Sequence, residues 1–251
     1  MDLGELTKKA ARAGVPLAIL EKDYAISVAL RIISESELKD SLIFKGGTAI
    51  KKAYFSEARF SEDIDFTVIN RKPTDVENIV REIFEGRKIG DFEILAVERE
   101  KTSAGLRIAL KFLGPLRHPQ RIRVDFSFRE KPAALVKEEK IVDEYQPPGY
   151  SLKTMGLEEI LAEKLRAVSS RSAPRDLHDI WFLTQKGVKV DSQLVAKKFE
   201  LYNEKFEKQK ALGRISELKR NWKGDLRQFM KRVPSFETVE KEVRELLAKE
   251  F

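Results

Sequence analysis

The chain has 251 residues, of which 42% are hydrophobic and 35% are charged, a balance typical of a globular rather than a disordered protein. No apolar run is long enough to cross a bilayer, and the first residues lack the apolar stretch of a secretory signal, so we expect a cytoplasmic protein. The absence of cysteine excludes disulfides, a thiol nucleophile and a cysteine-based zinc site.

The N-terminal part of the sequence predicts a helix followed by a short strand. Pro16 suits a first helical turn, and the apolar residues after it recur at helical spacing, so we expect a helix over 16–37. The apolar run 42–44 predicts a strand, which the glycine pair at 46–47 ends. Thr48 can cap a following helix that continues through AIKKAYF.

Alternating apolar and polar residues predict strands next. The segment IDFTVI has a period of two, and RIRVDFSF repeats this pattern later. Two further strands, DFEILAVER and GLRIALKFL, form an expected hairpin around KTSAG. Before the hairpin, Thr74 and Glu77 have the spacing of a capping box, which predicts a helix up to Phe84.

These elements divide the chain into two expected parts. After the turn signal QPPGY, helical spacing dominates to the end of the chain. We therefore expect an α+β fold, with a mixed β-sheet core and N-terminal helices over 1–150. A C-terminal α-helical lobe is expected over 151–251, with the boundary at 145–155.

Two aspartates stand two residues apart on a predicted strand. Asp63 and Asp65 should project to one side, while Ile64 and Phe66 anchor the other side in the core. Carboxylates held this close repel each other, and a hard divalent cation is the usual compensation. Asp125 has the same setting on a second strand, so neighbouring strands would gather three carboxylates around two metals about 3.5 to 4 Å apart. A salt-bridged surface pair is the alternative interpretation.

The glycine pair at 46–47 precedes a predicted helix. Glycine lets backbone N–H groups approach an anion closely, and the N-terminus of a helix favours phosphate. Metals and amides would then hold different parts of one triphosphate. An ordinary turn explains the same two glycines, so both interpretations stay open.

Two further groups of charged residues lie in predicted helices of the second half. Lys164 stands within an apolar helical stripe, where it either reaches a charge or extends to water at the edge of a lobe. Arg175, Asp176 and Asp179 lie at a helix start, where acids suit the helix dipole. Capping and ordinary ion pairing also explain these acids.

Four ordered motifs over residues 15–185 together resemble one family. They are FKGGTAIKKAYF, RFSEDIDF, EEILAEKLRA and RDLHDIWFL, and EKDY at 21–24 is similar to the family's N-terminal helix. This set resembles the AbiEii/AbiGii-type nucleotidyltransferases of the DNA polymerase beta-like superfamily, which are toxins of abortive-infection and type IV toxin–antitoxin systems. The resemblance implies a nucleotidyltransferase-like core, an NTP substrate, release of pyrophosphate and a cognate antitoxin encoded nearby.

The resemblance also implies roles for individual residues. The implied nucleotide-binding residues are Lys45, Gly46, Gly47, Thr48, Arg59, Ser61 and Lys164. The implied catalytic residues are Asp63, Asp65, Lys164 and Asp176, with Arg175 and Asp179 as additional candidates. The implied ligands of a two-Mg²⁺ site are Asp63, Asp65 and Asp125. For Arg59, an ion pair with a neighbouring acid is an equally good explanation.

The net charge of +7 falls in one segment, 197–232. It contains 12 Lys/Arg and 5 Asp/Glu, so the other 36 basic and 36 acidic residues cancel. Interleaved aromatic residues would suit a polyanion such as RNA, whereas solvated helix faces with aromatics in the core are the alternative.

With the family resemblance, these features favour transfer of NMP to the 3′ end of tRNA. Two alternatives remain: a nucleotidyltransferase acting on a small molecule or a protein hydroxyl, and a non-catalytic nucleic-acid-binding protein with the same fold.

Overall fold

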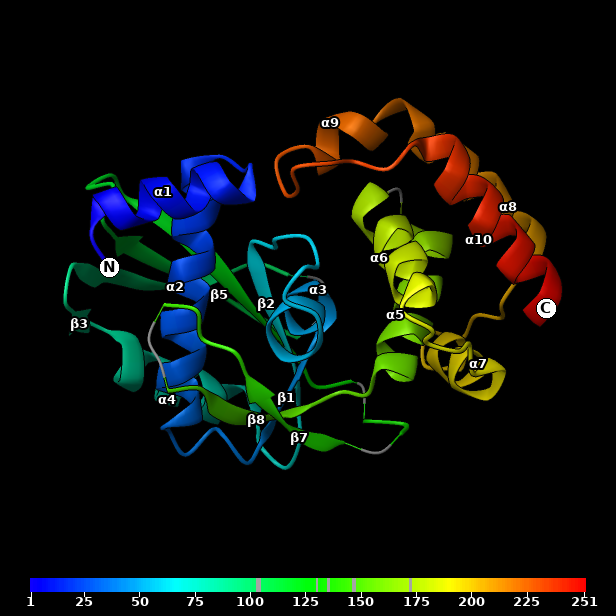
Figure 1. Ribbon diagram of the computed structural model, residues 1–251. Helices are drawn as coiled ribbons and strands as arrows, with labels where there is room; N and C mark the ends of the chain where they lie inside the picture. Colours follow the sequence, from blue (N-terminus) through cyan, green and yellow to red (C-terminus); the bar gives the residue numbers. More distant parts are fainter. Residues whose placement is uncertain (103–104, 130, 135, 146–147, 172) are drawn as a thin grey trace. The chain divides into compact units, whose positions relative to one another are not determined.

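The computed structural model describes residues 1–102, 105–129, 131–134, 136–145, 148–171 and 173–251 (Figure 1). The chain forms two compact units. The first comprises Met1–Pro132 and Val136–Thr154, and the second comprises Met155–Phe251 together with Ala133 and Ala134. In the described part of the chain, no helix combines the length and the apolar character needed to span a membrane.

The first unit is built on one eight-stranded mixed sheet with the strand order β3-β4-β5-β6-β2-β1-β8-β7. The strands are β1 (Leu42–Lys45), β2 (Asp63–Val68), β3 (Lys88–Ile89), β4 (Phe92–Glu100), β5 (Leu106–Leu113), β6 (Gln120–Ser127), β7 (Lys137–Ile141) and β8 (Tyr150–Thr154). The pairs β2–β6 and β1–β8 are parallel, and the other neighbouring strands are antiparallel.

Helices cover one face of this sheet. The helical elements of the first unit are α1 (Leu3–Ala13), α2 (Leu17–Ser34), α3 (Gly46–Ala49), the π-helix η1 (Ile50–Tyr54) and α4 (Pro73–Phe84). α2 packs on β6 and β8, α4 packs on β4 and β5, and the two helices contact each other, so they share a face. The apolar residues of β2 and β6, such as Phe66 and Phe126, are buried, whereas Asp63, Asp65 and Asp125 stay partly exposed on the other face.

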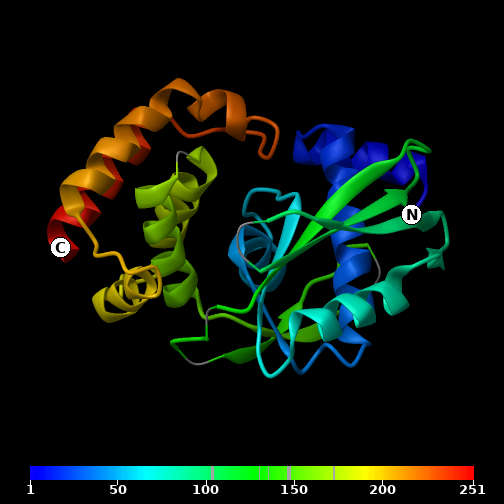
Figure 2. The ribbon, with the colours of Figure 1, turned by 180° about the vertical axis from the view of Figure 1, so that it is seen from behind.

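The second unit is helical in its described residues. Its elements are α5 (Leu157–Ser170), α6 (Pro174–Gln185), α7 (Ser192–Glu200), α8 (Lys208–Glu217), the 3₁₀-helix η2 (Leu218–Arg220), α9 (Trp222–Leu226) and α10 (Phe236–Glu250). α5 packs on α6, α7 and α8, and α10 packs on α6 and α8. Figure 2 shows these helices from behind, in yellow-green to red. Buried leucine, isoleucine and valine side chains fill the space between them.

The predicted α+β class is confirmed, but two predicted helix caps are wrong. Thr48 does not cap its helix, because α3 already begins at Gly46 and Lys45 is the N-cap residue. Thr74 does not form a capping box, because Pro73 occupies the first helical turn and the Thr74 hydroxyl bonds to Asp75 instead.

The prediction that helical spacing dominates after QPPGY is wrong for the first residues. β8 forms there and pairs with β1 and β7, so the first compact unit ends at Thr154. Ser151 and Lys153 do alternate with Tyr150, Leu152 and Thr154, but a run of five residues next to a turn is too short to separate a strand from the helix that follows. Two expected turns include residues 103–104 and 146–147, which lie outside the described residues.

Candidate active site

A row of charged residues crosses the partly exposed face of the sheet. The strand register places Lys45 of β1 opposite Asp65 of β2, Asp65 beside Asp125 of β6, and Asp125 opposite Arg107 of β5. Residues in register project to the same face of a sheet. The predicted neighbourhood of Asp65 and Asp125 is therefore present, with the two adjacent carboxylates flanked by Lys45 on one side and Arg107 on the other.

Gly46 and Thr48 fix the positions of the two aspartates of β2. Gly46 has φ +77°, and a Cβ atom there would clash with the carboxylate of Asp65. The Thr48 hydroxyl donates a hydrogen bond of 2.5 Å to the backbone carbonyl of Asp63. The side chain of Asp63 is 36% exposed, so its carboxylate can be reached by a ligand. The glycine turn and the aspartate pair thus form one interlocking unit.

Arg107 holds Asp125 in a bidentate ion pair. Its Nε and Nη2 atoms donate to the two carboxylate oxygens of Asp125 at 2.7 and 3.1 Å. These hydrogen bonds outweigh the effect of burial and raise the pKa of Arg107 above its usual range, with the charge of Asp63 contributing as well. Asp125, the third predicted metal ligand, is therefore already paired with the guanidinium of Arg107 in this structure.

The donor set suits a divalent cation bound through two carboxylates. Among the described residues, no group of three or more acidic, histidine or cysteine side chains is arranged to hold a metal. Mg²⁺ commonly uses one or two carboxylates and completes its coordination with water and substrate phosphates. Asp63 and Asp65 fit this mode of binding, and the carboxylate of Asp65 lies in the open space at Gly46. Asp125 fits it only after release from Arg107.

The glycine turn opens a short helical stretch directly after β1. α3 begins at Gly46 and continues as η1 to Tyr54. The first N–H groups of a helix lack helical partners, so they favour an anion. Lys45, which is almost buried, precedes them at the end of β1. The predicted phosphate-binding residues are therefore adjacent to the aspartates, as their spacing suggested.

A second cluster of charges lies entirely within the second unit. Lys164 of α5 donates to Asp176 at 2.9 Å and lies 2.8 Å from Asp179, both on α6. Both carboxylates are buried, and Arg171 makes a further bidentate contact with Asp176. The cluster brings together three of the residues implied by the family resemblance.

The carboxyl group of Asp176 is ionised against the effect of its burial. Burial alone would raise its pKa, but the charges of Lys164 and Arg171 and the hydrogen bonds of Arg171 outweigh it, so the pKa of Asp176 lies below its usual value. In this structure, Lys164 therefore contributes to stability by joining α5 to α6. Contact with a phosphate would require Lys164 to exchange at least one of these partners.

The remaining predicted site residues are Arg59, Ser61 and Arg175. Arg59 is buried and donates to the carbonyl of Phe60 at 3.0 Å. Ser61 is partly buried in the loop before β2. Arg175 lies with its guanidinium carbon 5.0 Å from the centre of the Phe229 ring, so it packs within the second unit.

The basic segment 197–232 separates into core aromatics and exposed cations. Phe199, Trp222 and Phe229 are buried, whereas Tyr202 and Phe206 are partly exposed, so the alternative that the aromatics point to the core holds for three of the five. Lys198 is buried as well and binds Glu159 and Glu163. Several other cations of the segment are exposed, among them Lys205, Lys210, Lys223, Arg227, Lys231 and Arg232.

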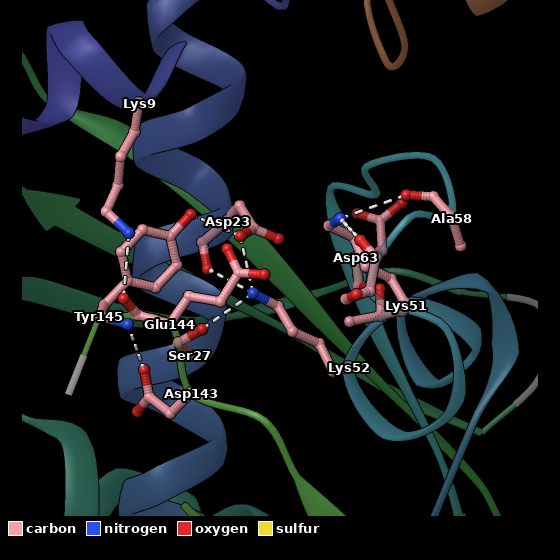
Figure 3. A network of polar contacts seen from close by, with 12 residues as sticks. Lys9, Asp23, Ser27, Lys51, Lys52, Ala58, Asp63, Asp143, Glu144 and Tyr145 are labelled. Carbon is pink, nitrogen blue, oxygen red and sulfur yellow. Dashed lines mark hydrogen bonds and ion pairs between the residues drawn. The ribbon is translucent and has the colours of Figure 1, made fainter. Parts of the chain in front are cut away.

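Two functional candidates were not predicted from the sequence, namely Arg107 and the consecutive lysines of η1. Arg107 is a polar position in an alternating strand, but only the antiparallel register with β6 reveals its partner. Lys51 and Lys52, which Figure 3 labels, are both buried, although lysine usually extends to water. The doublet in AIKKAYF gave no clear signal of this burial, because two adjacent lysines of a helix are only about 100° apart and can both face water.

A cavity of about 1080 Å³ in the first unit lies away from the aspartates. Its lining includes Ile43, Val68, Arg71, Phe128 and Lys153. Val68 stands at the other end of β2 from Asp63, so the strand length separates this cavity from the carboxylates. It is not a part of the candidate site.

Comparisons with known proteins identify the family and the fold of the chain. The family described as "Nucleotidyl transferase AbiEii toxin, Type IV TA system" matches residues 28–249. The solved structure of MenT4, a nucleotidyltransferase toxin from Mycobacterium tuberculosis H37Rv, has a TM-score of 0.78 at 20% identity, covering 99% of this chain and 89% of that chain. A protein from H. pylori described as a nucleotidyltransferase has a TM-score of 0.56 at 18% identity, covering 92% and 94%.

No curated protein matches the chain. The two structural likenesses concern the fold, and the family match extends over most of the sequence. The chain therefore belongs to the AbiEii family of nucleotidyltransferase toxins of type IV toxin–antitoxin systems.

Proposed function

We propose that this nucleotidyltransferase uses Mg²⁺ to transfer NMP from an NTP to the 3′-terminal hydroxyl of an RNA, with tRNA as the favoured acceptor. The observation that carries the proposal is the interlocking of Gly46 with Asp65. It joins a helix start that suits phosphate to carboxylates that suit a hard cation.

Asp63 and Asp65 would hold the cation, and the N–H groups at the start of α3 would bind phosphate oxygens of the NTP. When bound, Mg²⁺ supplies positive charge to the phosphate oxygens and to the attacking oxygen. The strand fixes both carboxylates before the substrate arrives, so little reorganisation is needed as charge develops. Asp125 would join them where the substrate displaces Arg107.

In the proposed reaction, the acceptor hydroxyl attacks the α-phosphorus of the NTP in line. A new bond forms between the acceptor oxygen and the α-phosphorus, and the bond from that phosphorus to the β-phosphate oxygen breaks. Pyrophosphate leaves, and the proton of the acceptor hydroxyl passes to a carboxylate of the site or to water. The cation held by Asp63 and Asp65 and the N–H groups at the start of α3 would stabilise the negative charge of the phosphate oxygens during this displacement.

We also propose a role for the cluster of the second unit. Lys164 is a cation with two carboxylate partners, and a triphosphate offers the same kind of negatively charged oxygen. Lys164→Arg retains a cation between Asp176 and Asp179, so the variant should stay folded. A loss of NTP affinity in Lys164→Arg would support contact with phosphate, and unchanged KM and kcat would assign Lys164 to the fold alone.

An RNA acceptor is favoured by the exposed cations of the second unit, because they can neutralise backbone phosphates. Blocking a tRNA 3′ end would prevent aminoacylation and arrest translation, which accounts for a toxin. This activity would take place in the cytoplasm, and we expect a gene for the antitoxin close to that of the toxin.

Incubation with each α-labelled NTP tests the proposal. Total tRNA, proteins and small hydroxyl compounds are offered separately, and label should remain on tRNA at its 3′ end. Asp63→Asn and Asp65→Asn should abolish labelling, and their thermal unfolding should show that they are folded. Label on a protein or small molecule would assign another acceptor, and no label with any acceptor would remove the proposed transfer reaction.

A further inference from the structure

Two consecutive lysines of η1 are buried and bind different partners. Lys52 donates to Asp23 at 2.7 Å and to Ser27 at 3.0 Å, both on α2. Lys51 donates to the backbone carbonyls of Ser56 at 2.6 Å and Ala58 at 3.2 Å. Figure 3 shows Lys52 directed toward α2 and Lys51 directed toward the loop that carries Ala58. The π-helix thus connects α2 to this loop.

The surroundings of Lys51 differ from those of an ordinary buried lysine. In the described residues its ammonium group is held by carbonyl oxygens and lies 4.2 Å from the centre of the Phe60 ring, without an ion-paired carboxylate. Burial lowers the pKa of Lys51, and the charge of Asp23 only partly offsets this effect. A buried ammonium with only carbonyl and ring partners is costly, so its retention calls for an explanation beyond simple packing.

The loop held by Lys51 leads directly to the candidate metal ligands. It runs from Phe55 to Glu62, and Asp63 is the next residue. At its far end, Glu62 pairs with Lys22 of α2 at 2.5 Å. The middle of this loop also has a backbone hydrogen bond from Ala58 to Phe55 and a side-chain hydrogen bond from Arg59 to the carbonyl of Phe60. Lys51 and Lys22 thus hold the loop at its middle and at its end, directly before Asp63.

We propose that Lys51 is a positioning residue for Asp63: its ammonium group fixes the loop 55–62 and thereby sets the carboxylate of Asp63 for binding a divalent cation. The inference rests on the proposed function, since it assumes that Asp63 and Asp65 bind the metal. It predicts that Lys51 strengthens cation binding, which is the opposite of what its positive charge alone would do. A positive charge near a cation site weakens cation binding, whereas a residue that positions a ligand strengthens it.

Lys52 provides a matched control within the same helical turn. It is also a buried lysine, but its partners lie on α2 and not on the loop. Lys51→Met and Lys52→Met remove the same charge from adjacent positions. Ser27→Ala, which removes one hydrogen bond of Lys52, is a milder control if Lys52→Met does not fold. Phe60→Leu removes the ring beside Lys51 and keeps the charge of Lys51, and so it is the milder variant for the surroundings of Lys51.

The test measures Mn²⁺ binding to the full chain by electron paramagnetic resonance, without nucleotide, and hydrogen exchange of the loop 55–62. In Lys51→Met we expect a loss of Mn²⁺ affinity of about 10-fold, the lower end of what loss of a ligand-orienting residue causes. Exchange in the loop should be faster. Phe60→Leu should change both quantities in the same direction by a smaller factor, while Ser27→Ala and Lys52→Met should leave Mn²⁺ affinity within about twofold of the wild type.

The possible results separate this inference from the proposed function. If the wild type binds Mn²⁺ and Lys51→Met binds it equally well or more tightly, Lys51 does not position Asp63, and the proposed function is unaffected. If the wild type binds no Mn²⁺ while remaining folded, the proposed metal site is wrong and the role of Lys51 is lost with it. If Lys52→Met lowers the affinity as much as Lys51→Met while Lys52→Met stays folded, loss of any buried lysine is the cause, and the inference is overturned.

Discussion

The carboxylate of Asp65 occupies the space that a side chain at Gly46 would fill. Gly46 also has φ +77°, a conformation that costs a residue with a side chain about 1–2 kcal/mol. Gly46→Ala should therefore displace Asp65 in addition to straining the backbone, with a large loss of Mn²⁺ affinity and of nucleotidyl transfer. Calorimetric titration with Mn²⁺ and the labelling reaction measure the two effects.

Gly86→Ala provides the control for Gly46→Ala. Gly86 has φ +67°, but an added Cβ atom there would meet no atom within 4 Å. It should lower the free energy of unfolding by a similar strain energy, about 1–2 kcal/mol, and leave Mn²⁺ affinity unchanged. Equal Mn²⁺ affinities in the two variants would show that Asp65 does not depend on the open space at Gly46.

Arg107 competes with a metal for Asp125, because its guanidinium already contacts both carboxylate oxygens. We predict that Arg107→Met raises Mn²⁺ affinity several-fold by releasing Asp125 and removing a positive charge near Asp63. In the double variant Arg107→Met/Asp125→Asn, the Mn²⁺ affinity should rise less than in Arg107→Met, because Asp125 can no longer act as a ligand. Metal titration of both variants and of the single Asp125→Asn variant gives the coupling energy.

Lys111→Met is the control for a change of charge on the same strand. Lys111 lies on β5 as well, but it pairs with Glu98. If Lys111→Met raises Mn²⁺ affinity as much as Arg107→Met does, a general change of charge explains both results, and Asp125 is not released for metal binding.

The local pattern around the site could be predicted from the sequence, but the partners across the sheet could not. The period of two around Asp63 and Asp65 determines which side chains share a face, so their common orientation follows from local geometry. The contact of Asp125 with Arg107 depends on the order and register of β5, β6 and β2. Periodicity contains no information on strand order.

The partners of two lysines were the other feature that the sequence left open. Lys51 and Lys164 are both long, charged side chains for which exposure to water is the ordinary expectation. Their partners are backbone carbonyls in one case and acids of the next helix in the other. Both arrangements depend on tertiary packing, and a helical pattern only indicates that these lysines lie near the apolar side.

The unfolding of the second unit should depend on pH through Asp176. Its pKa is below that of an unfolded aspartate, about 3.9, so it stabilises the native state above that value. This contribution is lost as the pH falls through the lower, folded pKa. The free energy of unfolding of the wild type should therefore decrease below about pH 4 more steeply than that of Asp176→Asn.

Trp181 and Trp222 both lie in the second unit, so urea unfolding followed by tryptophan fluorescence reports on this unit. Asp225→Asn, at an exposed acid of α9, serves as the comparison. If Asp176→Asn and the wild type lose stability in parallel below about pH 4, Asp176 is not the group responsible.

Binding of tRNA should depend strongly on salt through exposed cations of the second unit. Replacing Lys223, Arg227, Lys231 and Arg232 by glutamine should reduce the slope of log K against log salt by about 0.7 to 0.9 for each RNA phosphate that these side chains neutralise. The matched control replaces two lysines and two arginines that are exposed in the first unit, namely Lys8, Arg12, Lys72 and Arg87. Filter binding at several salt concentrations, with nucleotide absent, measures both slopes. An unchanged slope in the second-unit variant would place RNA binding elsewhere, because the slope reports the number of phosphates that cations neutralise and base stacking on aromatics does not change it.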